Sequence, residues 1–159
     1  MIDFLVTEDL GALDLGAPAR KPTSIDCEQW EAARELWRSK DGLMKIGVWE
    51  CTPGRFSADR AAASETCHLI SGRVTLHGGD GKSRDLCAGD MLVLPRGWRG
   101  EWTIHETTRK LYVLHADAGA SHSSAIEPAG IEDDKRSMFT MLLIPLRRQH
   151  RAVVRIHQM

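Results

Sequence analysis

Short runs of alternating apolar and polar residues, separated by turn-forming residues, occupy the middle of this 159-residue chain. The first runs predict a hairpin, with strands over residues 36–39 and 44–51 joined by a tight turn at Asp41 and Gly42. An Asp-Gly pair favours such a turn because both residues tolerate positive φ. Further strands are expected over residues 55–58, 65–76, 84–87, 91–94, 101–105 and 110–115. Many short strands without alternating helices predict an antiparallel β-sandwich or barrel, not a parallel βαβ fold.

The two ends of the chain lack this pattern. Near the N-terminus, Asp26 is expected to cap a short helix over residues 26–35, where apolar residues fall at helical spacing. Residues 116–137 are rich in Ala, Gly, Ser and acidic groups, which indicates a linker, and a dense apolar run and a basic end follow it. The predicted parts are an N-terminal arm (1–35), a β-barrel (36–115), and a linker with a C-terminal extension (116–159).

Charge and composition narrow the choice of partners. The net charge is −1 with 27% charged residues, which gives no electrostatic reason to expect nucleic acid or an acidic membrane as partner. No run reaches the length of a membrane span, and the acidic N-terminus does not read as a secretory signal. The four cysteines show no CxxC spacing. We therefore expect a cytoplasmic protein whose thiols are reduced and mostly packed as small hydrophobic groups.

Four segments of the barrel region resemble a known family. They are GVWECTPGRF (47–56), SETCHLISGRVTLHGGDG (64–81), CAGDMLVLPRGWRGEW (87–102) and TRKLYVL (108–114). In this order they resemble the cupin superfamily and, within it, small domains related to ureidoglycine aminohydrolase. The resemblance implies an all-β cupin fold, a double-stranded β-helix or jelly-roll barrel. It also implies a homodimer, since cupins commonly pair through their sheets.

Metal-binding cupins carry two histidines one residue apart, a glutamate, and a third histidine after a Pro-x-Gly corner. The matching positions here are Glu65 for the carboxylate, Ala58 and Arg60 (or Asp59 and Ala61) for the histidine pair, and Gly100 for the third histidine. At least three of the four ligands are therefore missing, and we expect no cofactor. A divalent metal would need substitutes. His68 should face away from Glu65 on a regular strand, and Cys67 shares the face of Glu65 but is expected to be a packed thiol.

Glu65 is the principal candidate for chemistry. A carboxylate inside a barrel needs a cation, a hydrogen-bond network or a raised pKa, and Arg60 and Lys110 are its possible partners. The result is either a functional site or a structural ion pair. Lys110 and Tyr112 share one strand face, which suits binding a carboxylate or polarising a carbonyl. The alternative places Lys110 on the outer face.

Aromatic residues and arginines complete the candidate set. Trp98, Gly100, Trp102 and Ile104 alternate along one predicted strand and should face inward. Together with Trp49, these tryptophans either line a cavity or fill the core, and Arg99 lies near the mouth of the barrel. The candidate catalytic residues are Glu65 and Lys110, and the candidate ligand-binding residues are Trp49, Arg60, Cys67, Arg99, Trp102 and Tyr112.

Three functions are compatible with this set. The first is a binding module that holds a small polar metabolite in the barrel without a metal. The second is an enzyme resembling ureidoglycine aminohydrolase, acting on a small nitrogenous or acidic metabolite, with Glu65 as acid/base and Lys110 binding substrate. The third is a structural, dimer-forming protein whose barrel is filled by its own side chains.

Overall fold

A computed structural model of the protein describes residues 4–117 and shows only strands, turns and loops in that part of the chain. The strands are β1 (Ala19–Arg20), β2 (Trp30–Arg38), β3 (Met44–Cys51), β4 (Gly54–Asp59), β5 (Ala63–Gly78), β6 (Ser83–Cys87), β7 (Met91–Leu94) and β8 (Arg99–Ala116). Within residues 4–117 no helix is long and apolar enough to cross a membrane. The predicted apolar run, the basic end and nearly all of the predicted linker lie outside the described residues.

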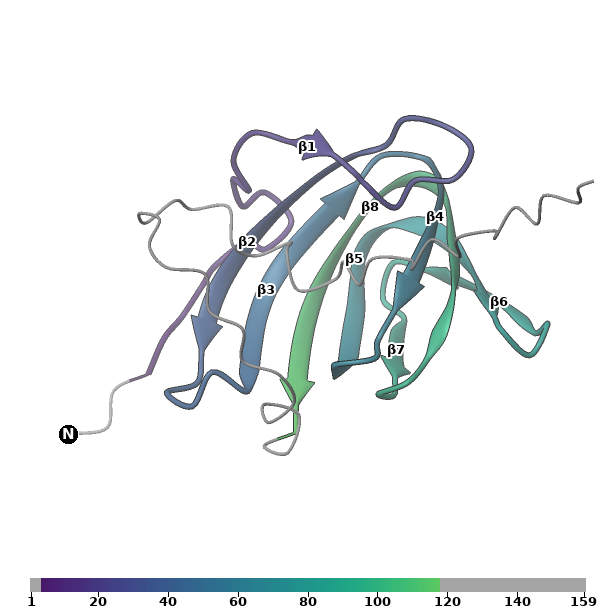
Figure 1. The fold of residues 1–159 in the computed structure, drawn as a ribbon. Coiled ribbons are helices and arrows are strands. Elements are labelled where there is room, and N and C mark those ends of the chain that lie inside the picture. Colours follow the sequence, from purple (N-terminus) through teal and green to yellow (C-terminus); the bar gives the residue numbers. More distant parts are fainter. Residues whose placement is uncertain (1–3, 118–159) are drawn as a thin grey trace, which may run out of the picture. The chain divides into compact units, whose positions relative to one another are not determined.

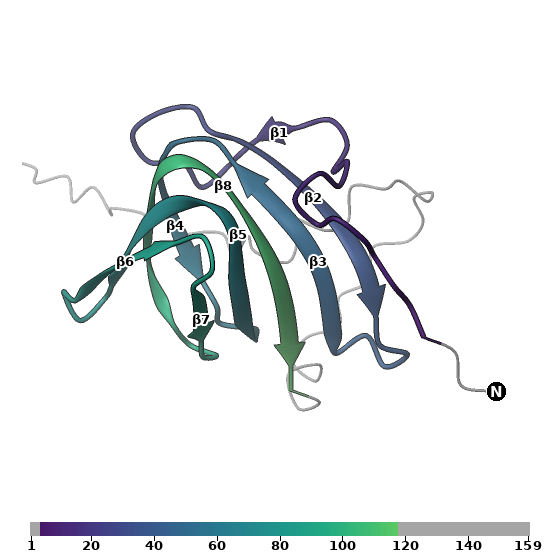
Figure 2. The same cartoon turned by 180° about the vertical axis from the view of Figure 1, so that it is seen from behind.

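Two long strands, β5 and β8, build the barrel by belonging to both of its sheets (Figures 1 and 2). The second half of β8 pairs with β3 and with the first half of β5, whose other edge carries β7. The first half of β8 pairs with β4 and with the second half of β5, whose other edge carries β6. All pairings are antiparallel. The predicted all-β jelly-roll barrel is confirmed, and the strands expected over 101–105 and 110–115 are one continuous strand.

Both long strands bend where they pass from one sheet to the other. Gly72 in β5 has φ of 89°, a conformation that side chains rarely adopt. A Cβ at this position would also collide with the side chain and backbone of Thr108 on β8. The pairing register between the two strands shifts between Leu69 and Val74. Glycine at residue 72 therefore lets the two strands bend together at close distance.

Strand β2 occupies residues for which the sequence predicted a helix. The expected helix from Asp26 is absent: residues 26–29 have no regular structure, and Trp30–Arg38 pairs with β3 through the turn at Asp41 and Gly42. The hairpin was correct, but its first strand is longer than residues 36–39. Ala, Glu, Leu and Arg are good helix formers, and this local preference is outweighed by hydrogen bonding to β3. The boundary predicted between residues 35 and 36 falls inside β2.

The core lies between the two sheets. Its fully buried side chains include Trp102, Leu69, Val48, Val74, Cys51 and Cys67. Trp102 and Ile104 face inward as predicted, while Trp98 precedes β8 and is half-buried. The thiols divide evenly, since Cys27 and Cys87 are exposed. The prediction that the cysteines are packed as small hydrophobic groups is therefore right for Cys51 and Cys67 alone.

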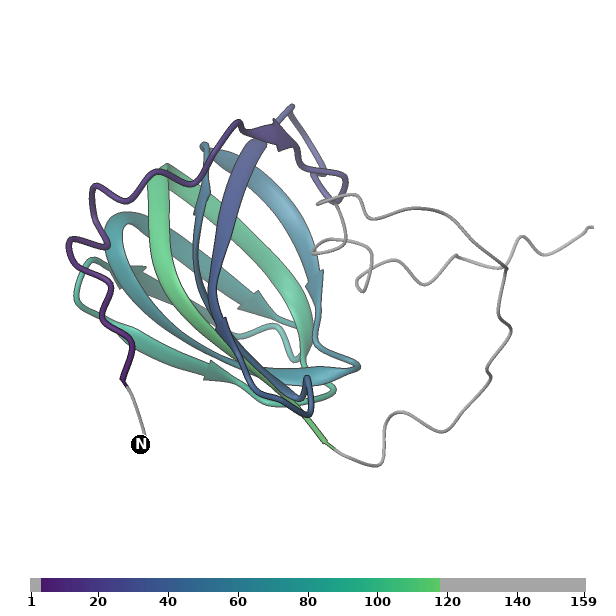
Figure 3. The same ribbon diagram turned by 90° about the vertical axis from the view of Figure 1, so that its left-hand side faces the viewer.

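The N-terminal arm is fastened along the barrel mainly by Arg109, and Arg34 Nη1 donates one further hydrogen bond to the backbone oxygen of Asp14 at 3.1 Å. Figure 3 shows the arm running over the strands before it reaches β1. Arg109 Nη1 donates to the backbone oxygens of Leu10, Gly11 and Leu13 at 2.7–3.1 Å, and Arg109 Nε donates to Glu50 at 2.8 Å. Because Glu50 and Arg109 are cross-strand partners on β3 and β8, the arm is tied to the middle of a sheet.

Replacing Arg109 by lysine should loosen the arm without unfolding the barrel. Lysine keeps the charge beside Glu50 but cannot present the guanidinium fork to the backbone carbonyls, so we expect a loss of about 1–2 kcal/mol in unfolding free energy. Limited trypsin digestion measures the effect directly, as cleavage after the exposed Arg20 should become several-fold faster. Arg73→Lys, in the exposed pair with Glu106, is the matched control. Equal cleavage rates in both variants would contradict the anchoring role.

Candidate functional site

Glu65 lies at the centre of a buried ion-pair cluster. Its side chain is 5% exposed, and one carboxylate oxygen accepts from Lys110 Nζ at 3.0 Å. The other oxygen accepts from Nε and Nη2 of Arg60. β5 supplies the carboxylate, β8 supplies the lysine, and the residue after β4 supplies the arginine. Both partners predicted for Glu65 are therefore present, and Lys110 lies inside the barrel, not on the outer face.

The two cations keep Glu65 ionised. Burial opposes its charge, but Lys110 and Arg60 outweigh burial and lower the pKa of Glu65 to about 2. Burial also opposes the charge of Lys110, yet Cys67 and Glu65 offset that effect and the pKa of Lys110 lies above its ordinary value. Such a carboxylate is a weak base at neutral pH, whereas a general base works best with a pKa near the working pH. The cluster is therefore better suited to electrostatic binding than to proton transfer.

Two aromatic rings lie against the lysine of this cluster, and a third ring contacts both of them. Lys110 Nζ lies 4.7 Å from the ring centroid of Trp49 and 4.4 Å from that of Trp102. Phe56 stands between the two indoles, stacked on Trp102 at 6.0 Å and tilted against Trp49 at 5.9 Å. Desolvated cation–π contacts of this kind are favourable. The ammonium of Lys110 thus has a carboxylate on one side and aromatic faces on others.

The structure adds a second buried ion pair that the sequence did not reveal. Lys21, just after β1, contacts Glu31 of β2 at 2.6 Å, and their side chains are 10% and 3% exposed. Glu31 also accepts from Trp49 Nε1 at 2.9 Å, and Lys21 Nζ lies 4.1 Å from the Phe56 ring centroid. Burial lowers the pKa of Lys21, with Glu31 acting against it. The arm therefore brings a second buried cation against the same aromatic group.

The Lys21–Glu31 ion pair could be found only from the complete strand pairing, not from a local sequence signal. Lys21 is an isolated lysine in the arm, and Glu31 falls in the segment that local propensity assigned to a helix. Only the pairing of β1 with β2, and of β2 with β3, brings the two residues against Trp49. Phe56 was likewise missed, although its place in β4 was predicted to be a strand.

The residues at the expected metal positions do not fit a metal. Ala58 is buried and lies directly opposite Gly100 in the pairing of β4 with β8. Of the two possible histidine pairs, Ala58 and Arg60 are thus the ones directed inward. Arg60 places a guanidinium against Glu65, where a metal would need a free carboxylate. A positive side chain at a ligand position repels a divalent cation, and neither Ala58 nor Gly100 offers a donor atom.

The third histidine position is also sterically closed. A Cβ on Gly100 would collide with the backbone oxygen of His77 and come within 2.6 Å of the Trp98 ring. Trp98 is thus the indole that packs against Gly100. Within residues 4–117 no three His, Cys, Asp or Glu side chains gather in a way that could hold a metal ion. His68 is exposed, as expected for the face opposite Glu65.

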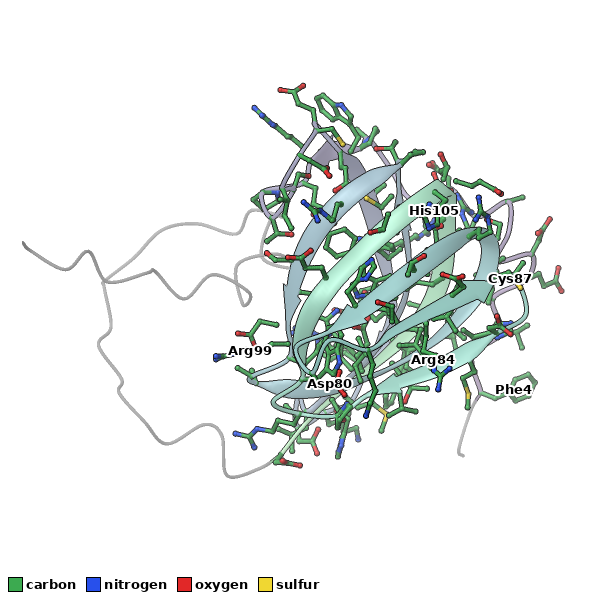
Figure 4. The ribbon with its side chains drawn as sticks, turned by 90° about the vertical axis from the view of Figure 1, so that its right-hand side faces the viewer. Phe4, Asp80, Arg84, Cys87, Arg99 and His105 are labelled. Carbon is green, nitrogen blue, oxygen red and sulfur yellow. The ribbon has the colours of Figure 1, made fainter. Side chains whose placement is uncertain are left out.

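The remaining candidate residues lie either inside the barrel or at its rim. Cys67 and Tyr112 are buried beside the cluster, and burial raises the pKa of the Cys67 thiol to about 12 and raises that of Tyr112. A thiol with that pKa is not a thiolate nucleophile. Arg99 lies at the rim, pairs with Asp59 at 3.0 Å and is 72% exposed. Figure 4 shows Arg99 at the edge of the barrel, directed away from the interior, with Cys87 and His105 also on the outer surface.

Comparisons with known proteins agree with this architecture. The family model of the EutQ-like cupin domain matches residues 38–112. A DUF861 family protein of unknown function from Pseudomonas syringae pv. tomato str. DC3000 is 28% identical with a TM-score of 0.58, and the match covers 67% of this chain and 46% of that one. This chain thus spans less than half of that protein. A comparison with curated protein sequences gave no match.

Two more distant structures support the fold alone. The putative ethanolamine utilization protein Q from Salmonella typhimurium LT2 is 20% identical with a TM-score of 0.51, covering 62% of this chain and 78% of that one. The Schizosaccharomyces pombe Cnp3 cupin domain is 12% identical with a TM-score of 0.55, covering 70% and 74%. At such identities a shared architecture carries no shared activity.

Proposed function

We propose that this protein, whose residues 38–112 match the family model of the EutQ-like cupin domain, binds a small polar metabolite in its barrel without a metal. The observation that supports this proposal is the pairing of Glu65 with Arg60 and Lys110. Two side-chain cations meet the carboxylate at the position where a metal-binding cupin would place its ion. They supply, as permanent parts of the chain, the positive charge that a metal would otherwise bring.

The alternative is an enzyme resembling ureidoglycine aminohydrolase, with Glu65 as acid/base. A pKa of about 2 for Glu65 favours the binding function over this alternative, because such a carboxylate accepts a proton poorly at neutral pH. A binding role needs only a fixed charge distribution, which the cluster has. The predicted homodimer and cytoplasmic location are compatible with either function and stay predictions.

Metal analysis of protein purified without a histidine tag tests the first part of the proposal. We expect Mn, Fe, Ni and Zn each well below one equivalent per chain, and a melting temperature unchanged by a chelator. The physical reason is the pair of cations that already occupy the only buried carboxylate among the expected metal positions. One equivalent of any of these metals, lost together with stability on chelation, would contradict the proposal.

A thermal-shift screen with carboxylates, ureides and sugars tests the second part. A ligand at about 100 times its dissociation constant should stabilise the protein by about 2.7 kcal/mol, and the shift should be the same with and without chelator. Failure of every compound to shift the melting temperature would count against a binding module and favour a barrel filled by its own side chains.

A further inference from the structure

One buried donor inside the barrel has no acceptor. The Trp102 side chain is fully buried (0% exposed), and its Nε1 makes no hydrogen bond within the part of the chain that the structure describes. Burying an N–H group without a partner carries a free-energy cost. Trp49 shows the contrast, since its Nε1 is satisfied by Glu31. An acceptor that is not part of residues 4–117 would remove this cost at Trp102.

The charge beside Trp102 is also unbalanced. Glu65 is a single carboxylate shared by Arg60 and Lys110, so the cluster carries one positive charge in excess. Lys110 has three N–H bonds but donates one hydrogen bond within residues 4–117, to Glu65, and its ammonium lies 4.4 Å from the Trp102 ring. The nearby Asp59 is half-exposed and paired with Arg99 at the rim. The Lys21–Glu31 pair is balanced by itself.

From this juxtaposition we infer that the ligand carries one carboxylate, which accepts a hydrogen bond from Trp102 Nε1 and neutralises the excess charge at Lys110 and Arg60. The inference rests on the proposed metabolite-binding function and names its ligand class. A monocarboxylate supplies one acceptor group and one negative charge, which are the two quantities that the interior lacks. Both interactions gain strength from burial, because the surrounding side chains are aromatic and the local dielectric constant is low.

Other anions fit the same surroundings less well. A phosphate monoester carries close to two negative charges at neutral pH, which exceeds the single positive charge in excess. A neutral amide has an acceptor for Trp102 but leaves the positive charge uncompensated. The walls formed by Trp49, Phe56 and Trp102 suit a short apolar body behind the carboxylate.

Isosteric probes test the inference in solution. Acetate and acetamide have nearly the same shape and differ in charge, and each longer monocarboxylate can be paired with its own amide. The chain has five tryptophans, so a ¹H–¹⁵N spectrum gives five indole peaks, and Trp102→Phe identifies the peak of Trp102. We expect acetate to move that peak in a saturable manner and to bind at least about tenfold more tightly than acetamide, a difference typical of one charge-assisted hydrogen bond.

Trp102→Phe also tests the donor itself. Phenylalanine keeps an aromatic ring against Phe56 and Lys110 but has no N–H group, so we expect the acetate affinity to fall about tenfold. Trp37→Phe, at the partly exposed Trp37 of β2, should leave the affinity unchanged. If Trp102→Phe folds poorly, the contact of the Trp102 indole with the Phe56 ring assigns its peak in a NOESY spectrum of the unmodified protein, and the acetate-induced shift is measured on that protein.

The outcomes separate this inference from the proposed function. Amides that bind as tightly as their carboxylates, or carboxylate binding that leaves the Trp102 peak in place, would overturn the carboxylate assignment while metal-free binding stands. Binding of carboxylates that requires added metal would overturn the proposed function itself. If no compound of either series binds, both fail, and the partner of Trp102 Nε1 is no metabolite.

Discussion

Glu65→Gln is expected to lower the free energy of unfolding by about 3–5 kcal/mol, the cost of leaving buried charges without their counter-ion. Lys110 is 5% exposed and Arg60 11% exposed, so neither cation can turn to water without moving the barrel wall. Glutamine has nearly the same shape but no charge, and the loss is therefore electrostatic. Urea unfolding at neutral pH measures it. For a domain of this size, such a loss is a large share of the total stability.

The same substitution on the surface is the control. Glu106 pairs with Arg73 at 3.3 Å, and both side chains are more than half exposed. Glu106→Gln should change the unfolding free energy by less than about 1 kcal/mol, since exposed pairs contribute little. If Glu65→Gln and Glu106→Gln lower the unfolding free energy equally, the Glu65 cluster is not a desolvated charge network. A second variant, Glu65→Leu with Lys110→Met, should recover part of the loss because it removes a carboxylate and a buried cation together.

At low pH, the difference in unfolding free energy between the unmodified protein and Glu65→Gln should disappear. The folded-state pKa of Glu65, about 2, lies below its ordinary value of 4.5, so the folded state binds the proton less readily than the unfolded chain does. Its stabilising contribution is complete above about pH 4.5 and disappears as the pH falls through about 2. The pKa difference corresponds to roughly 3 kcal/mol, which agrees in size with the cost expected for Glu65→Gln.

Urea unfolding at several pH values, run in parallel on both proteins, measures this loss. We expect the gap in unfolding free energy to be constant near neutrality and to narrow steadily below about pH 4.5. Comparing the two proteins at each pH removes the contribution of other carboxylates that titrate in the same range. A gap that stays constant down to about pH 3 would mean that Glu65 has an ordinary pKa and is not held ionised by Lys110 and Arg60.

The barrel was predictable from the sequence because its signals are local. The Asp41–Gly42 turn and the bend at Gly72 need particular backbone conformations, and the alternation around Trp102 and Ile104 marks an inward face. Strand β2 was not predictable in this way. Its residues prefer a helix in isolation, and only the pairing with β3, set by the fold as a whole, makes them a strand.

The candidate site was predictable only where the alternation along a strand assigns the direction of a side chain. Glu65, Arg60 and Lys110 lie in or beside strands whose faces could be assigned from alternation. Lys21 and Glu31 could not be assigned, because their burial depends on how the arm crosses the barrel. Arg99 stands next to inward residues in sequence, yet it falls on the alternate face and reaches the rim, where it pairs with Asp59. Only the structure shows which of the expected metal-ligand positions are sterically closed, as Gly100 is.

Strand β8 has a consequence for how the chain assembles. It pairs with β3, β4 and β5, and it follows all three in the sequence. During synthesis from the N-terminus, the β2–β3 hairpin can form early, but β4 stays without its partner until residue 104 has been made, and the first half of β5 stays without its main partner until residue 116 has been made. Pairings such as Ala63 with Ala116 close long loops, which slows folding. The ionic cluster, which needs Lys110 from this same strand, is therefore among the last features to be enclosed.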